Sequence, residues 1–273
     1  MPIESYYKQV EPSDPGAAVI WRFMSSDKFR DFLTTGELYF CRADLFKGDE
    51  REGLPPEEFL STLGLNPFDI LERQELCNQL GSSDQFRESL YINCWQLMLD
   101  ERDESSRMWD EYSPGESGVA VCSRYGLLKS ALDGLPDRAY LGLVQYGGEH
   151  VDRGNLFNFA FTKRRQYEDE REVRALLWIM DPQEGCNRHI GPDNRLYSYA
   201  LTRPSPERVP LGQRRKVDVA ALVTEIVVTP WAAQETVEQV RALVASCGYD
   251  IRVRPSALTK YRDFLPKSTD IRV

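Results

Sequence analysis

The stretch of sequence that decides the fold reads Phe161-Thr162-Lys163-Arg164-Arg165-Gln166-Tyr167-Glu168-Asp169-Glu170-Arg171-Glu172-Val173-Arg174-Ala175-Leu176-Leu177-Trp178-Ile179-Met180. Its first half is densely charged and its last residues are apolar. With the period of two that a strand requires, Glu170, Glu172 and Arg174 project from one face. Further along, both faces are apolar, which is typical of a central strand covered on both sides. The pattern predicts a buried strand over residues 172–180, with two carboxylates and a guanidinium at its entrance.

The amino-acid composition limits the class of protein, the binding partners and the cellular compartment that we expect. Its 273 residues are 41% hydrophobic and 11% aromatic, which is typical of a globular protein. With 34 Lys and Arg against 43 Asp and Glu, the net charge is −9, which argues against long-range attraction to nucleic acid or anionic lipid. The six cysteines are scattered and form no C-x-x-C motif, which favours a reducing, cytoplasmic setting. There is no signal peptide and no apolar run long enough to span a membrane, so we expect no membrane partner.

The chain has two histidines, His150 and His189, both in loop-like sequence rich in Gly and Asp. We expect both at the surface. A Ser-His-Asp or Cys-His mechanism would need one of them, and no partner residue accompanies either. Any chemistry would therefore depend on carboxylates, Arg, Lys and Tyr.

The rest of the sequence predicts alternating short strands and helices. By residue number these are strands at 18–24, 37–41, 90–95, 118–122, 139–146, 222–229 and 251–254, and helices at 27–34, 54–88, 125–132 and 232–246. Residues 1–17 are interpreted as a lead-in, and residues 181–216 as a long loop that ends in the solvated basic run Arg214-Arg215-Lys216. We expect one α+β domain over residues 18–273, with a mixed, mainly antiparallel sheet flanked by helices.

Several separated pieces of sequence stand in the order of one family pattern. They are Trp21-Arg22-Phe23, Leu38-Tyr39-Phe40, Asp49-Glu50-Arg51-Glu52-Gly53, Met108-Trp109-Asp110-Glu111-Tyr112 with Gly118, Val144-Gln145-Tyr146, Lys163 through Glu170-Arg171-Glu172-Val173-Arg174, Glu225-Ile226-Val227-Val228-Thr229-Pro230, and Ser256-Ala257-Leu258. In this the chain resembles the DUF2971 family of bacterial proteins. It departs from that pattern at Tyr167, where Trp is usual, at Glu50, where Pro is usual, and at Asn93-Cys94, where Ser is usual. The resemblance implies common ancestry, but it does not indicate which reaction the protein catalyses.

The polar residues within these pieces allow two readings. They could line one cleft, or they could form a structural ion-pair network in which Arg174 and Arg22 neutralise Glu170 and Glu172.

Within the cleft reading, the combination resembles an ADP-ribosyltransferase. Enzymes of that class often carry an Arg on the first strand, here Arg22, and a Glu-x-Glu at the entrance of a later strand. The resemblance implies NAD as substrate, a protein or nucleic-acid acceptor, no bound metal, and a role such as toxin or phage-defence effector. Glu172 would stabilise the ribosyl cation and Glu170 would orient the acceptor.

The other implied roles concern binding. Arg22 would hold the pyrophosphate and Lys163 a phosphate, with Arg174 beside them. Tyr112 or Trp109 would stack on the nicotinamide, although two aromatic residues three apart can equally be core residues on one helical turn.

Two other functions stay open. Asp49, Glu52, Glu170 and Glu172 could hold Mg²⁺ in a nuclease or phosphodiesterase, although no carboxylate-x-Lys pair accompanies them. Alternatively, the chain is a non-catalytic, defence-associated binding module that presents its acidic surface and the 181–216 loop to a protein partner.

Overall fold

A computed structural model of the chain describes residues 10–46, 53–54, 87–100, 103–137, 139–147, 157–179, 188–190, 196–198 and 210–264. Its strands are β1 Val19–Met24, β2 Glu37–Arg42, β3 Leu90–Leu97, β4 Val119–Arg124, β5 Ala139–Leu143, β6 Gln145–Tyr146, β7 Thr162–Lys163, β8 Glu172–Trp178, β9 Arg188–Ile190, β10 Leu196–Ser198, β11 Gly212–Lys216, β12 Glu225–Val228 and β13 Val253–Pro255. Its helices are α1 Ser26–Thr35, α5 Ser106–Tyr112, α6 Tyr125–Asp133, α7 Phe157–Ala160, α8 Val219–Leu222 and α9 Gln234–Ser246, with 3₁₀ turns η1 Ala43–Leu45, η2 Arg165–Glu170 and η3 Ala257–Phe264.

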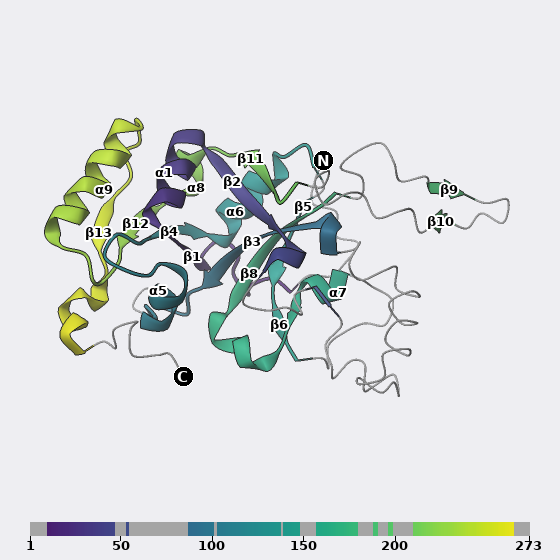
Figure 1. Cartoon of the computed structure of the whole chain (residues 1–273), viewed down its shortest axis with the longest axis horizontal. Coiled ribbons are helices and arrows are strands. Elements are labelled where there is room, and N and C mark those ends of the chain that lie inside the picture. Colours follow the sequence, from purple (N-terminus) through teal and green to yellow (C-terminus); the bar gives the residue numbers. More distant parts are fainter. Residues whose placement is uncertain are drawn as a thin grey trace.

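The main sheet runs in the order β11-β2-β3-β1-β4-β12-β13, and β8 lies between β3 and β5 (Figure 1). Its described pairs are antiparallel except β12 with β13, which is parallel. Beside it lie the antiparallel pair β9–β10 and the parallel pair β6–β7. The chain is therefore a single α+β domain with a mixed, mainly antiparallel sheet, as the sequence predicts.

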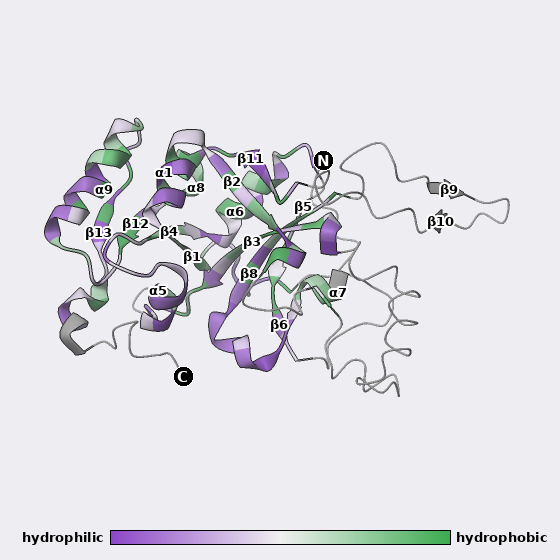
Figure 2. Cartoon of the chain, in the orientation of Figure 1, coloured by the Kyte–Doolittle hydropathy of each residue, from purple (hydrophilic) through white to green (hydrophobic). Residues whose placement is uncertain are grey.

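The apolar end of the deciding stretch forms β8 in the interior of this sheet. Val173, Ala175 and Leu177 belong to the larger core, and Leu176 faces a smaller cluster on the other side. All four side chains are essentially unexposed. Figure 2 shows the change along the chain, from the hydrophilic turn of η2 to the largely hydrophobic strands at the centre of the sheet. The predicted central strand is confirmed, and burial on both faces explains why its apolar residues do not alternate with polar ones.

The two faces of the sheet carry different helices. Helices α1, α6, α8 and α9 pack on the face of the larger core, and α5 and α7 contribute to the clusters on the other face. Alternation along β1 separates the two, because Ile20 lies in the larger core while Trp21 packs with Trp109 of α5. The face that holds α5 also holds the entrance of β8.

Strand β3 has two neighbours along its other edge, and they diverge. Strand β2 pairs with Tyr91 and Ile92, whereas β1 pairs with Gln96 and Leu97. Between these two pairings the Tyr39 carbonyl of β2 accepts hydrogen bonds from Asn93 Nδ2 (2.8 Å) and from Arg22 Nη2 (3.2 Å). This divide in the sheet brings the Arg22 of β1 toward the middle of β3.

The largest correction concerns residues 181–216, which were expected to form a loop. They contain the β9–β10 pair, and residues 212–216 pair along their length with β2 as an edge strand. The basic run is therefore part of the sheet. A charged edge strand lacks the apolar alternation by which strands are recognised, and charge at an edge discourages pairing with other chains.

Other boundaries move by a few residues. The strand predicted over 222–229 starts at Glu225, because Leu222 ends α8, a helix capped by the Asp218 side chain on the Ala221 N–H (3.1 Å). The strand predicted over 139–146 is divided at Val144 into β5 and β6. Most of the helix predicted over 54–88 lies outside the described residues, as do Asp49, Glu52 and His150. None of the described helices combines the length and apolar character needed to cross a membrane.

Candidate functional site

The junction before β8 brings Glu170 and Glu172 to the same place by a route other than strand alternation. Glu170 ends η2, and Arg171 adopts a left-handed conformation (φ 41°, ψ 52°) before β8 begins at Glu172. The expectation that Glu170 lies on the strand is therefore wrong. The left-handed backbone costs a non-glycine residue about 1–2 kcal/mol. It is held by an Arg171–Asp103 ion pair (2.5 Å) and by the Leu97 N–H, which donates to the Arg171 carbonyl (2.8 Å).

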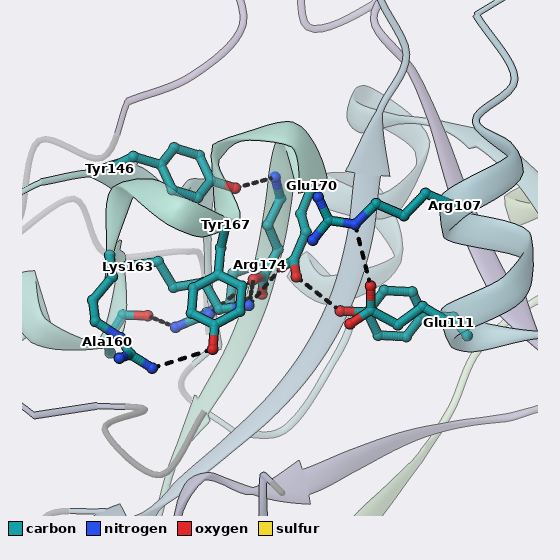
Figure 3. Close-up of polar contacts among 11 residues, drawn as sticks. Arg107, Glu111, Tyr146, Ala160, Lys163, Tyr167, Glu170 and Arg174 are labelled. Carbon is teal, nitrogen blue, oxygen red and sulfur yellow. Dashed lines mark hydrogen bonds and ion pairs between the residues drawn. The ribbon is translucent and has the colours of Figure 1, made fainter. Parts of the chain in front are cut away.

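Lys163 joins the two carboxylates. It lies on β7, which pairs with β6, and its Nζ is 2.7 Å from Glu170 Oε2 and 3.0 Å from Glu172 Oε2. Figure 3 shows Lys163, Glu170 and Arg174 directed toward one another. The three side chains of this bridge, Lys163, Glu170 and Glu172, are only 9%, 6% and 4% exposed. Two buried carboxylates therefore share one ammonium group.

Arg174 holds the carboxylate of Glu172 in place. Its Nε donates to Glu172 Oε1 (2.8 Å) and its Nη2 to Oε2 (3.0 Å), and a third N–H donates to the Ala160 carbonyl. The guanidinium is fully buried. The backbone N–H of Glu172 donates to the Tyr146 hydroxyl (2.8 Å). In this structure Arg174 positions Glu172, and its predicted role in binding stays a prediction.

Glu172 is ionised in spite of its burial. Burial by itself would raise the pKa of this carboxyl, but the charges of Arg174 and Lys163 and the hydrogen bonds from Arg174 and the Cys94 thiol outweigh it. The pKa of Glu172 therefore lies well below its usual range. Lys163 takes part in this balance, so its ammonium neutralises carboxylates where a phosphate contact was expected.

Tyr112 connects the network to the surface. Its hydroxyl donates to Glu170 Oε1 (3.0 Å), and the residue is 42% exposed. Burial of the hydroxyl and the neighbouring Glu170 charge raise the pKa of Tyr112 above its ordinary value, so the phenol stays a neutral donor. Tyr112 is thus linked to Glu172 through Glu170 and Lys163, and the cleft expected around these residues stays a prediction.

Arg22 lies near this network but outside it. Its guanidinium donates to the Tyr39 carbonyl and, within the described part of the chain, forms no ion pair with a carboxylate. Burial lowers the pKa of Arg22 to about 10, which still leaves it a cation at neutral pH. The Cys94 thiol, which hydrogen-bonds Glu172, lies within electrostatic range of Arg22. Of the two arginines expected to neutralise the glutamates, only Arg174 does so.

Trp109 belongs to the core. It is fully buried on α5 and packs edge to face against Phe23, with ring centroids 4.8 Å apart. Its ring faces are covered by protein, so the structure does not present it to a nicotinamide ring as predicted. Two residues that contact Glu172 have no role assigned from the sequence, namely Tyr146 and Cys94. Both stood in the quoted pieces, but nothing in the sequence alone indicated that they contact Glu172.

Among the described residues, no group of three or more His, Cys, Asp or Glu side chains is arranged to hold a metal ion. The predicted Mg²⁺ ligands Asp49 and Glu52 lie outside those residues.

Comparison with known proteins yields only remote structural likeness. No protein-family model and no curated protein matches the chain, so membership of the DUF2971 family is not supported. Among solved structures, the chain is similar to Thermus sp. 2.9 DarT in complex with NAD⁺ (TM-score 0.38, 13% identity, 89% of this chain and 97% of that chain). The same protein in complex with ADP-ribosylated ssDNA gives a TM-score of 0.35 at 13% identity, over 90% of this chain and 95% of that one. In complex with carba-NAD⁺ it gives 0.34 at 12% identity, over 89% and 96%. A likeness this remote says nothing about what the present chain binds.

Proposed function

We propose that the chain cleaves the nicotinamide–ribose bond of NAD and transfers the ADP-ribosyl group to an acceptor or to water. In this reaction the C1′–N bond breaks and its electron pair leaves with nicotinamide. A nucleophilic atom of the acceptor forms the new bond to C1′ and releases its proton. The transition state is an oxocarbenium-like cation, so the site must stabilise positive charge on the ribose.

The observation that carries the proposal is the shared position of the Lys163 ammonium. It stands within 3.0 Å of an oxygen of both Glu170 and Glu172, at a point where two buried carboxylates converge. Such a point stabilises a cation, and lysine is a flexible residue whose ammonium can move aside. A ribosyl cation would take the place of the ammonium beside Glu172, while Lys163 remains paired with Glu170.

The surrounding residues support distinct roles. Glu172 is held rigidly by Arg174 and by the Tyr146 hydroxyl, which is the preorganisation that charge stabilisation requires. Glu170 would orient the acceptor. The exposed ring of Tyr112 would cover the nicotinamide. Arg22, a half-buried cation without a carboxylate partner in the described chain, would bind the pyrophosphate.

The test is nicotinamide release by the purified wild type and by Glu172→Gln and Glu170→Gln. Glu172→Gln keeps the shape and removes the charge, so we expect at least about a hundredfold loss of rate. Glu170→Gln should reduce transfer to an acceptor more than hydrolysis, because water needs less orientation than a specific nucleophile.

Glu104→Gln is the matched control, since Glu104 is also a buried, paired carboxylate but lies in another cluster. It should lower the melting temperature and leave release per folded molecule unchanged. A purely structural network predicts a different result for Glu172→Gln. Both Glu172→Gln and Glu104→Gln would then lower the melting temperature, and neither would change nicotinamide release per folded molecule. Absence of release by the wild type with water, peptide and oligonucleotide acceptors would contradict the proposal.

A role as a toxin or phage-defence effector in the cytoplasm follows from the same activity, because an NAD-consuming enzyme is harmful where NAD is abundant. Expression of the wild type should arrest growth, and expression of Glu172→Gln at the same level should not.

A further inference from the structure

Gln96 is a buried amide beside the site, and it has no hydrogen-bond partner among the residues that the structure describes. In the register of the sheet it lies opposite Glu172 of β8 on one side and opposite Trp21 of β1 on the other. It is 1% exposed. Within the described part of the chain, neither its Nε2 nor its Oε1 makes a hydrogen bond. Native structures seldom leave both ends of a buried amide unpaired, so these groups call for a ligand.

A second amide on the same strand shows the usual arrangement. Asn93 is also 1% exposed, but its Nδ2 donates to the Tyr39 carbonyl (2.8 Å) and its Oδ1 accepts from Trp95 Nε1 (2.6 Å). The two residues are three positions apart in β3, so alternation places them on opposite faces. Asn93 has structural partners, and Gln96 faces the side of the sheet where the carboxylates lie.

The surroundings of Gln96 suit a flat, polar-edged ring. Residues directly opposite in antiparallel strands project on the same face, with Cβ atoms about 5 Å apart, so Glu172 and Gln96 are immediate neighbours. Trp21 and Phe23 follow on that face, with ring centroids 6.0 Å apart, and Phe23 is half-buried. One cross-strand step on either side of this amide therefore reaches a carboxylate, that of Glu172, and a buried aromatic ring, that of Trp21.

We propose that Gln96 recognises the carboxamide of the nicotinamide ring, by donating from Nε2 to the carboxamide oxygen and accepting at Oε1 from its NH₂ group. This inference rests on the proposed function. The ring nitrogen carries the ribose, and the carboxamide is attached one ring carbon away from it. A ring whose ribose meets Glu172 therefore presents its carboxamide within reach of the neighbouring Gln96. The site would then select NAD among dinucleotides by its amide.

The experiment compares three dinucleotides on the full chain, with dissociation constants measured by calorimetry in the cold, where turnover is slow. NAD carries both the acceptor and the donor. The 3-acetylpyridine analogue keeps the carbonyl and loses the NH₂ group. The nicotinic acid analogue carries a carboxylate, which would face both Gln96 Oε1 and Glu172. For the wild type we expect about fivefold to tenfold weaker binding of the acetylpyridine analogue, and at least about a hundredfold weaker binding of the nicotinic acid analogue.

Gln96→Met keeps the volume and removes both polar groups. It should bind NAD and the acetylpyridine analogue equally well, within about twofold, because the discriminating amide is gone. It should also raise the melting temperature by at least about 2 °C, because two unpaired buried polar atoms are removed. Asn93→Leu is the contrast and should lower the melting temperature, because it leaves the Trp95 N–H without its acceptor and the Tyr39 carbonyl with the Arg22 guanidinium alone.

Two results would overturn the inference alone. One is NAD binding by the wild type with no preference over the acetylpyridine analogue. The other is a Gln96→Met protein that keeps the preference and melts at a lower temperature, which would show that a buried water satisfies the amide. Failure of the wild type to bind any of the three dinucleotides would instead overturn the proposed function, and this inference with it.

Discussion

Two clusters of buried carboxylates can be compared in this molecule. The site network consists of Glu170, Glu172, Lys163, Arg174 and Tyr112. The C-terminal clamp consists of Glu104, Glu225, Arg254, Ser256 and Ala257. In the clamp, Glu104 accepts from Arg254 Nη1 (3.2 Å), from the Ser256 hydroxyl and from the Ala257 N–H (2.9 Å), and Arg254 also pairs with Glu225 (2.7 Å). The clamp ties the segment before α5 to β13 and η3.

The comparison shows that burial and ion pairing do not by themselves identify a functional site. The Glu104 side chain is as buried as any in the site network. The difference lies in the donors. The donors to Glu104 include the backbone N–H of Ala257 and the hydroxyl of Ser256, whose short side chain cannot move away. Glu170 and Glu172 instead share the flexible Lys163 ammonium, and Glu170 accepts from the partly exposed Tyr112. A cluster that can exchange one of its cations can bind substrate, and a cluster of fixed donors holds chain segments together.

The largest effect that would test this comparison comes from removing the arginine of each cluster. Arg174→Met leaves the buried Glu172 carboxylate with the shared Lys163 ammonium and the weak hydrogen bond of the Cys94 thiol, so we expect a loss of about 3–5 kcal/mol in the free energy of unfolding. Arg254→Met should cost about 1–3 kcal/mol, because Glu104 keeps two donors. Urea unfolding of both variants measures the difference. Equal losses would contradict the distinction between a network dependent on charge and a clamp of mixed donors.

Acid provides the next test, because it acts on Glu172. The pKa of Glu172 in the folded protein lies below its unfolded value of about 4.3, so the folded state binds fewer protons. The ion pairs of Glu172 therefore contribute their full stabilisation above about pH 4.3, and this contribution is lost as the pH falls from there toward the lower pKa of the folded state. Between neutral pH and about pH 3 the wild type should lose at least about 1.4 kcal/mol more stability than Glu172→Gln. The measurement is the unfolding free energy in urea at successive pH values, and parallel curves for the two proteins would refute it.

The smallest effect concerns the turn that aligns the two glutamates. Arg171 is the one non-glycine residue with positive φ in the described part of the chain. Arg171→Gly relieves that strain and loses a half-buried pair with Asp103, so its unfolding free energy should stay within about 1 kcal/mol of the wild type. Arg171→Val also loses the ion pair with Asp103, and it places a β-branched side chain in the left-handed conformation. Its free energy of unfolding should therefore be about 1–2 kcal/mol below that of Arg171→Gly. A valine variant as stable as the glycine variant would show that the turn relaxes.

Local pattern predicted much of what surrounds the site. The period of two placed Glu172 and Arg174 on one face of a strand, and the apolar run after them placed that strand inside the sheet. Both predictions are confirmed, because alternation and burial on two faces produce a recognisable pattern within the seven residues of β8. The first strand and helix, β1 and α1, are likewise close to the predicted 18–24 and 27–34 for the same reason.

What the sequence by itself determined is therefore the strand, its charged entrance and the class of fold. Only the tertiary structure decided which charges meet. Glu170 reaches the site through a left-handed turn held by Asp103 and Leu97, which are distant in sequence. Lys163 is brought between the carboxylates by the short β6–β7 pairing. Arg22 meets the Tyr39 carbonyl where β1 and β2 diverge along β3, and no carboxylate among the described residues pairs with it. Such contacts depend on where separate segments of backbone pack together, and side-chain periodicity within one segment contains no information about that.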